Sequence, residues 1–320
     1  MPAAIDPGSW EPTTTQQMLR QRAQLLAYLR DFFHQREVLE VETPLLGAHT
    51  VTELHIDSMA VRERWLQTSP EYCMKRLLAA GSGPIFQICK AFRHGEAGSR
   101  HNPEFSLLEW YRPGFSLEQL IQEVAELVSG WLSPEQPGNW ESLTYRELFQ
   151  QELDVDPLTA EVGELRALAE SRLDLSIEGG DRDDWLDLLM SHLLEPVLAA
   201  RGLVFVYNYP ASQAALARLG EETGQSVARR FELYARGVEL ANGYFELCDP
   251  REQRSRFEQD NRRRRARGKP ELKMDNRLLN ALEAGLPECC GVALGIDRLL
   301  MLSSGSARLE QVLSFPWSRA

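Results

Sequence analysis

The chain has 320 residues, 43% of them hydrophobic, so it can bury a full core as one large domain or two ordinary ones. Its net charge of −12 excludes broad nucleic-acid binding unless a local basic patch overcomes that field. Charges interrupt every apolar run before it reaches the roughly 20 residues of a membrane span. Five scattered cysteines without CxxC spacing argue against a disulfide framework or a zinc site, and we expect a cytoplasmic protein.

The N-terminal part alternates between polar and apolar segments. Residues 1–14 are polar and rich in proline and threonine, without the features of a secretory signal, so we expect a flexible lead-in. From residue 15 to about 36, apolar side chains repeat at helical spacing and predict one amphipathic helix. Residues 38–44 favour a strand, and Pro44 places it at a sheet edge or a subunit boundary because proline cannot donate to a sheet ladder.

The middle of the chain predicts strands and then helices. Strand-like segments span 58–61, 64–68, 84–93 and 104–112. A helix is expected after Ser69-Pro70-Glu71, and Ser116 with Gln119 forms a plausible capping box for another. From 133 to about 202 the pattern is helical without evident chemistry, which we interpret as an insertion in a single catalytic domain at 15–320.

The C-terminal third returns to strands. Residues 231–235 and 238–247 flank Arg236-Gly237 and predict a β-hairpin. A strand at 290–294 then runs through Gly295 into a helix at 296–302. One α+β domain around an antiparallel β-sheet flanked by helices is the economical prediction.

Three segments carry residues suited to chemistry. Alternation along 104–112 puts Glu109 and Tyr111 on one face, where a buried carboxylate needs a cation, either a substrate ammonium or a protein arginine. In the hairpin, Glu232 and Glu239 suit a Mg²⁺ ion shared with nucleotide phosphates. At the start of the last helix, Arg298 can reach a phosphate or a purine face.

A basic run stands apart from these segments. Its cations are Arg262 to Arg265, Arg267 and Lys269. Such runs usually form a solvated helix end. The alternative is a docking surface for an acidic partner.

These segments together resemble the class II aminoacyl-tRNA synthetases, and among them the lysyl-tRNA synthetases. The region of Pro44 resembles motif 1, residues 92–111 resemble motif 2, and Gly291 to Arg298 resemble motif 3. Thr68 to Glu71 and Glu239 to Gly243 resemble the lysine-specific signatures. The resemblance implies the class II catalytic core, with ATP and Mg²⁺ as cofactors and a homodimer formed through motif 1.

The resemblance also implies roles for individual residues. Arg93 and Arg298 are implied to be catalytic, on the α-phosphate and on the adenine and γ-phosphate side. The implied ATP-binding residues are Arg93, His94, Gly95, Asn102, Glu239, Leu240, Gly295 and Arg298, and the implied Mg²⁺ ligands are Glu232 and Glu239. The implied amino-acid-binding residues are Ser69, Pro70, Glu71, Glu109, Tyr111, Asn242, Glu246 and Ala293. Glu246, helped by Tyr111, is expected to take the distal ammonium.

The chain departs from the lysyl-tRNA synthetases in three ways. Motif 1 begins near residue 18, so we expect no anticodon-binding barrel before the core. Ala293 stands where those synthetases resemble one another in having glycine, and its methyl group should shift substrate choice by about 1–3 kcal/mol. Gly95 stands where motif 2 has an acid, with Glu96 one place later.

In its short length, in Ala293 and in the motif 2 sequence, Asn102 to Phe105 followed by Leu108 to Pro113, the chain resembles the lysyl-tRNA synthetase paralogues that modify elongation factor P. That resemblance implies activation of (R)-β-lysine as its adenylate and transfer to a lysine ε-amine of elongation factor P, with tRNA an unlikely partner and no membrane involved. Two alternatives stay open: a truncated lysyl-tRNA synthetase that charges tRNA, and a non-catalytic regulatory paralogue.

Overall fold

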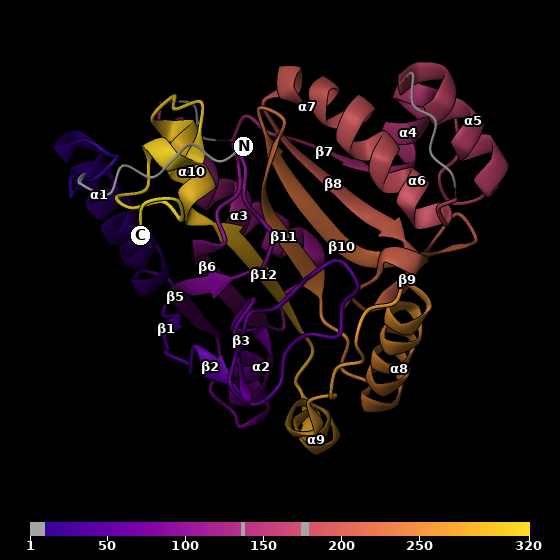
Figure 1. The fold of residues 1–320 in the computed structure, drawn as a ribbon, viewed down its shortest axis with the longest axis horizontal. Coiled ribbons are helices and arrows are strands. Elements are labelled where there is room, and N and C mark those ends of the chain that lie inside the picture. The colour runs from indigo at the N-terminus through magenta and orange to yellow at the C-terminus, as the bar shows by residue number, and fades with distance from the viewer. Residues whose placement is uncertain (1–9, 136–137, 174–178) are drawn as a thin grey trace.

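A computed structural model describes residues 10–135, 138–173 and 179–320, so most of the predicted lead-in lies outside the described residues. Its central sheet follows the strand order β1-β5-β6-β12-β11-β10-β8-β7, with β9 paired to β10 (Figure 1). The strands are β1 (Leu39–Glu40), β5 (Ile85–Phe92), β6 (Glu104–Pro113), β7 (Glu141–Thr144), β8 (Leu203–Pro210), β9 (Leu219–Glu222), β10 (Gln225–Ala235), β11 (Val238–Phe245) and β12 (Cys289–Gly295). Adjacent strands are antiparallel except β1–β5 and β7–β8, so the predicted α+β fold with an antiparallel-dominated sheet is confirmed.

Helices flank this sheet, and a small second sheet lies beside it. The helices are α1 (Gln16–His34), α2 (Glu71–Ala79), α3 (Leu117–Leu132), α4 (Tyr145–Leu153), α5 (Val162–Leu173), α6 (Arg182–Leu189), α7 (Glu195–Arg201), α8 (Pro250–Ala266), α9 (Asn276–Gly285) and α10 (Ile296–Ser303). Short helical turns occur at η1 (Met190–Leu194), η2 (Ala211–Gln213) and η3 (Leu309–Gln311), and the small sheet consists of β2 (Leu46–Gly47), β3 (Ala60–Val61) and β4 (Arg64–Leu66). The capping box predicted at Ser116 and Gln119 is present at the start of α3.

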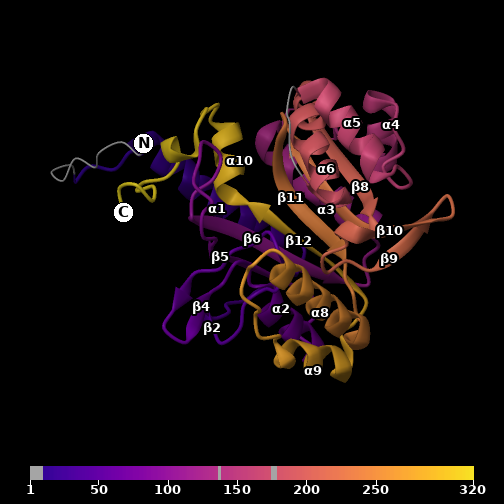
Figure 2. The same cartoon turned by 45° about the vertical axis from the view of Figure 1, so that its right-hand side comes forward.

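The two faces of the central sheet differ in chemistry. On the back face, alternate residues such as Trp110, Phe231 and Leu294 are buried against α1, α3 and α10, which together form the main hydrophobic core. The intervening residues of the same strands point to the front face. Figure 2 shows α2, α8 and α9 grouped below the sheet and α4 to α6 above it.

A tight turn fixes the hairpin of β10 and β11. Arg236 and Gly237 both have positive φ, 50° and 71°, as a two-residue type I′ turn requires. A Cβ at Gly237 would lie 2.8 Å from the carbonyl oxygen of Glu195. The glycine therefore also allows α7 to pack closely on the hairpin.

The region predicted as a helical insertion contains α4 to α7 and also the strand β7, which extends the sheet next to β8. It buries its own apolar cluster, with Phe149, Trp185 and Leu189 among its members. Across the described residues, no helix is both long and apolar enough to cross a membrane. The five cysteines are free thiols.

Candidate active site

A cleft of about 720 Å³ opens on the front face of the sheet, between the loop that joins β5 to β6, the helices α2 and α8, and the α6–α7 segment. The predicted site residues that line it are Arg93, Asn102, Glu239, Leu240, Gly295, Arg298, Ser69, Glu71, Glu109, Tyr111, Asn242, Glu246, Ala293 and Glu232. Three predicted residues lie elsewhere. His94 donates its backbone N–H to the backbone oxygen of Asp57 (2.7 Å), Gly95 follows it with a positive φ, and Pro70 precedes α2 and lines a second pocket.

Strand register aligns the floor of the cleft in a row across four strands. Glu109 pairs with Ala293, Ala293 with Asn242, and Asn242 with Glu232. Partners in adjacent strands share a face of the sheet, so the predicted amino-acid-binding and metal-binding residues stand side by side.

A second row lies two residues along each strand. Tyr111 pairs with Gly291 and Gly291 with Tyr244, which in turn pairs with Arg230. A Cβ at Gly291 would overlap both the Tyr111 ring and Oε1 of Glu246, so the glycine allows these two groups to meet. Tyr244 and Arg230 were not among the predicted site residues, although their period-2 spacing from Asn242 and Glu232 indicates the same face.

Glu109 is a buried acid at the centre of the first row, 2% exposed. Its two oxygens accept hydrogen bonds from the hydroxyls of Ser69 (2.6 Å) and Tyr111 (2.8 Å). Burial and the nearby charge of Glu71 raise the pKa of Glu109 to about 8. No protein cation pairs with it among the described residues, which favours the substrate-ammonium alternative over a salt bridge to arginine.

Glu246, the acid expected to take the distal ammonium, is 1% exposed and already has a protein partner. The Nζ atom of Lys75 lies 2.6 Å from Oε2 of Glu246 and 2.7 Å from Oε1 of Glu71. Burial raises the pKa of Glu246 to about 7, with Lys75 opposing the rise and Glu71 adding to it. Lys75 was missed from the sequence, although its position four residues after Glu71 on a helix predicts a shared face.

The two predicted catalytic arginines lie in the same cleft but differ in how they are held. The Arg93 guanidinium has a long contact to Glu96 (3.5 Å) and lies over the Phe105 ring (5.1 Å to the centroid), and its buried Nε has no hydrogen-bond partner among the described residues. Arg298 is anchored by Glu239, whose backbone oxygen accepts at 2.8 Å, and by His101 at 2.7 Å. Arg93 is therefore free to bind an anion without first breaking a strong contact.

The two predicted Mg²⁺ ligands also differ. Glu239 exposes 39% of its side chain to the cleft, with Arg298 at 3.3 Å. Glu232 is held by Arg230, Tyr209 and Tyr234, yet only Arg230 bonds to its Oε1, which keeps a lone pair for a cation. The described residues contain no cluster of three or more metal-binding side chains. Two carboxylates, each with a cation partner and part of its accepting capacity left, suit Mg²⁺, which takes few protein ligands beside substrate phosphates.

Asn102 connects the motif 2 loop to the C-terminal segment. Its amide nitrogen donates to the backbone oxygen of Glu104 (2.6 Å), and its side-chain oxygen accepts the N–H of Trp317 (2.9 Å). Ser99 of the same loop accepts the N–H of Leu309 (2.8 Å). Both polar ends of Asn102 are thus engaged in holding the loop.

The predicted insertion contributes acids to the cleft, although its sequence suggested no chemistry. Asp183, Asp187 and Glu195 line the wall, from α6 and from the start of α7 after the π-helical turn η1. Burial and Asp183 raise the pKa of Asp187 to about 6, and burial and Glu239 raise that of Glu195 to about 7. These acids are far in sequence from every motif, so the sequence did not predict that they line the cleft.

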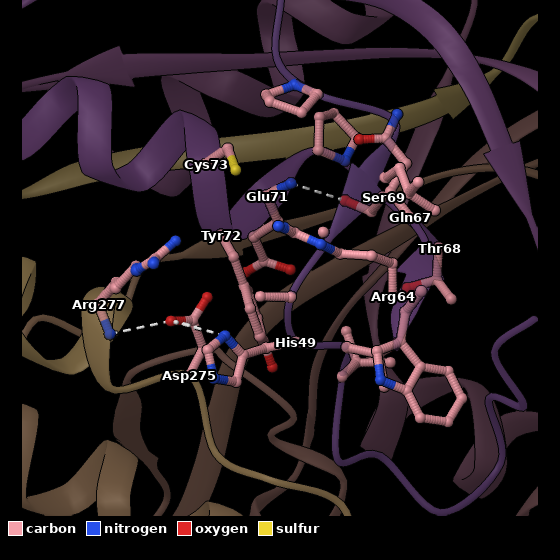
Figure 3. Close-up of a pocket in the computed structure, with 18 of the residues that line it drawn as sticks. His49, Arg64, Gln67, Thr68, Ser69, Glu71, Tyr72, Cys73, Asp275 and Arg277 are labelled. Carbon is pink, nitrogen blue, oxygen red and sulfur yellow. Dashed lines mark hydrogen bonds and ion pairs between the residues drawn. The ribbon is translucent and has the colours of Figure 1, made fainter. Parts of the chain in front are cut away.

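A smaller pocket of about 140 Å³ lies behind the cleft wall (Figure 3). It shares Ser69 and Glu71 with the cleft, and Figure 3 shows the N–H of Glu71 directed at the Ser69 hydroxyl, at 3.0 Å. On its far side, the Asp275 carboxylate lies 3.6 Å from the His49 ring and accepts the N–H of Arg277. Glu71 therefore stands in the partition between the two pockets.

Most cations of the basic run have partners within the chain. Arg264 is 3% exposed and donates to backbone oxygens of Pro270 and Glu53. The remaining pairs join Arg265 to Glu271, Arg267 to Asp181 and Asp184, and Lys269 to Asp57. These contacts favour the structural interpretation for that part of the run. Arg262 and Arg263 are exposed, and Arg263 borders the cleft.

Comparison with known proteins identifies the family. A sequence model described as tRNA synthetases class II (D, K and N) matches residues 10–319. The chain belongs to this class II tRNA synthetase family. Among curated relatives of this class II chain, "Elongation factor P--(R)-beta-lysine ligase" of Klebsiella pneumoniae (strain 342) is 48% identical, and the protein of the same name from Salmonella arizonae is 47% identical. Each alignment covers 98% of both chains, and the predicted family membership is confirmed.

Proposed function

We propose that this chain is an ATP-dependent ligase that activates (R)-β-lysine as an adenylate and transfers it to the ε-amine of a lysine on elongation factor P. In the first step a substrate carboxylate oxygen bonds to the α-phosphorus of ATP, and the bond to pyrophosphate breaks. In the second step the lysine nitrogen bonds to the activated carbonyl carbon. AMP then leaves, the nitrogen loses a proton, and an amide is formed.

The row from Glu109 through Ala293 and Asn242 to Glu232 carries this proposal. Its acids line the same cleft as Arg93 and Arg298, so groups suited to an ammonium and groups suited to phosphates share one space. Relatives that match almost the whole chain are named as ligases for this reaction, which supports assigning both ends to one substrate pair.

At the ammonium end, we assign Glu109, Tyr111 and Glu246 to the two amines of β-lysine. A buried carboxylate is stabilised by an ammonium that replaces its lost hydration. Oε1 of Glu246 faces Gly291 and Tyr111. We therefore assign that oxygen and the Tyr111 hydroxyl to the distal amine, and Asn242 and Glu71 to the rest of the amino acid.

At the phosphate end, we assign Arg93 to the α-phosphate because its guanidinium lacks strong partners. Arg298, anchored on Glu239 and His101, provides a fixed positive charge for the outer phosphates. Glu232 and Glu239 would hold Mg²⁺, which when bound neutralises phosphate charge. The protein contributes position and charge and no covalent intermediate.

For the partner, we assign Arg262 and Arg263 to an acidic surface of elongation factor P, since both are exposed and Arg263 borders the cleft. Replacing both by glutamine should slow transfer several-fold, by about 1 kcal/mol or less per exposed contact, and leave adenylate formation unchanged. An unchanged transfer rate would leave these two arginines as solvated charges.

We also propose that the chain forms a homodimer through the motif 1 region. Large apolar side chains are exposed there on neighbouring segments, namely Leu39, Leu45, Leu46 and Val61. Exposed apolar groups that lie together are typical of protein interfaces. Sedimentation of the purified chain tests this, and a monomer at micromolar concentration would contradict it.

The decisive experiment incubates the chain with ATP, Mg²⁺, elongation factor P and either β-lysine or α-lysine. We expect elongation factor P to gain the mass of one β-lysyl group, with AMP and pyrophosphate released. Charging of tRNA without modification of elongation factor P would favour the truncated synthetase. Absence of pyrophosphate exchange with either amino acid would favour the regulatory paralogue.

A further inference from the structure

We propose that Lys75 is a positioning residue that orients the carboxylates of Glu71 and Glu246 and keeps Glu246 ionised, so that the amino-acid pocket selects a substrate with two amines. This inference rests on the proposed function, because it concerns the same pocket. It adds a residue that no sequence motif singled out. The geometry around the ammonium of Lys75 carries it.

The ammonium of Lys75 bridges two acids that belong to different parts of the chain. Nζ lies 2.7 Å from Oε1 of Glu71, one turn earlier on α2, and 2.6 Å from Oε2 of Glu246, just after β11. Lys75 is only 1% exposed, and Met74 and Leu78 on the same helix are also buried. Its charge is therefore fixed behind the pocket wall and does not compete with a substrate for space in the cleft.

Each acid pairs with Lys75 through one of its two oxygens. Oε2 of Glu246 is taken by Lys75, whereas Oε1 faces Gly291 and the Tyr111 ring. Both acids line the cleft. The lysine thus orients the carboxylates while leaving an acceptor atom on each for a substrate amine.

The arrangement also sets the charge of the pocket. Glu71, Glu109 and Glu246 influence one another electrostatically, and burial disfavours the charge of each buried acid. Without a cation, the least costly response is for one acid to take up a proton. A protonated Glu246 no longer attracts a distal ammonium, so selectivity for a diamine over a monoamine depends on Lys75.

The test compares two substrates in pyrophosphate exchange with saturating ATP. One is β-lysine, and the other is 3-aminohexanoic acid, which is the same β-amino acid without the distal amine. In the Lys75→Met variant at pH 7 we expect kcat/KM for β-lysine to fall about 50-fold, as a rise of about two units in the pKa of Glu246 from about 7 would cause. For 3-aminohexanoic acid we expect kcat/KM to change by less than about threefold. The ratio of kcat/KM for β-lysine to that for 3-aminohexanoic acid should therefore fall sharply.

Matched controls separate positioning from folding. Lys90→Met removes an exposed lysine that pairs with Glu104 at 3.3 Å, and should leave both substrates unchanged. Lys75→Arg keeps the positive charge and should keep the preference for β-lysine. The KM for ATP and the melting temperature report whether each variant is folded.

Three outcomes overturn the inference. Equal losses for both substrates in Lys75→Met would make Lys75 a structural residue only. Unchanged preference in that variant would show that Glu246 stays ionised without it. If Lys75→Met does not fold, loss of the preference in Lys75→Arg with a normal KM for ATP contradicts the charge argument. If the chain without substitutions shows no pyrophosphate exchange with β-lysine, the proposed function itself is overturned. That measurement comes before any variant is made, so the two failures can be told apart.

Discussion

Glu109 and Ala293 are partners in the register of β6 and β12, so the methyl group of Ala293 lies beside a buried carboxylate on the floor of the cleft. Asn242 flanks the methyl group on its other side. The methyl group therefore sits between two side chains assigned to the amino acid.

We expect Ala293→Gly to improve the use of α-lysine relative to β-lysine by about tenfold, because one methyl group in a pocket is worth roughly 1–3 kcal/mol. The measurement is the ratio of kcat/KM for the two amino acids in pyrophosphate exchange. If the ratio does not change, the methyl group does not contact the substrate.

Gly291→Ala should damage the same pocket by adding a methyl group. The added Cβ overlaps the Tyr111 ring and the Glu246 carboxylate, which must move apart. We expect kcat/KM for β-lysine to fall at least tenfold and stability to fall by about 1–3 kcal/mol. Gly163→Ala on α5, where nothing lies within 4 Å of the new Cβ, is the matched control. Equal behaviour of the two variants in exchange assays would contradict the assignment of Glu246.

Arg298→Ala should abolish adenylate formation while leaving the fold intact. The guanidinium is anchored by Glu239 and His101, so it is held ready for negative charge. Loss of one preorganised charged donor costs about 10²–10³ in rate. Pyrophosphate exchange measures this, with Arg265→Ala as control because Arg265 pairs with Glu271 on the surface. Normal exchange in Arg298→Ala would show that this arginine does not serve the nucleotide.

The pH dependence of β-lysine use should reflect two buried acids. Burial raises the pKa of Glu109 to about 8 and that of Glu246 to about 7, and only the ionised forms attract an ammonium. Protonation at low pH therefore removes binding. We expect kcat/KM for β-lysine to fall about tenfold per pH unit below pH 8, and more steeply below pH 7. Saturating β-lysine should flatten the profile of kcat. A profile of kcat/KM that is level down to about pH 6 would rule out this role for both acids.

Local patterns in the sequence were enough to predict which residues form the floor of the cleft. Alternation along 104–112 predicted that Glu109 and Tyr111 share a face, and their hydrogen bond at 2.8 Å agrees. The hairpin around Arg236-Gly237 was also predicted, because a two-residue turn has strong local preferences. Both signals depend on residues close in sequence.

The walls of the cleft could not be predicted in the same way. Lys75 meets Glu246 across 171 positions of the chain, and no local pattern reports such a contact. Asp187 and Glu195 reach the cleft only because the insertion folds over it. Asn102, assigned to the nucleotide by its motif, lines the cleft and has both polar ends bound to the protein backbone, and its nucleotide role stays a prediction.

The division of the sheet into an apolar back and a polar front has an evolutionary consequence. Within β12, Val292 and Leu294 serve the core while Gly291 and Ala293 serve the cleft. Replacing a front residue leaves its buried neighbours in place, whereas inserting or deleting one residue would exchange the two sets. New substrate preferences can therefore arise by point mutation at alternate positions of a strand. Variants with one residue inserted or deleted in the strand would misfold and be eliminated before any change in preference could be selected.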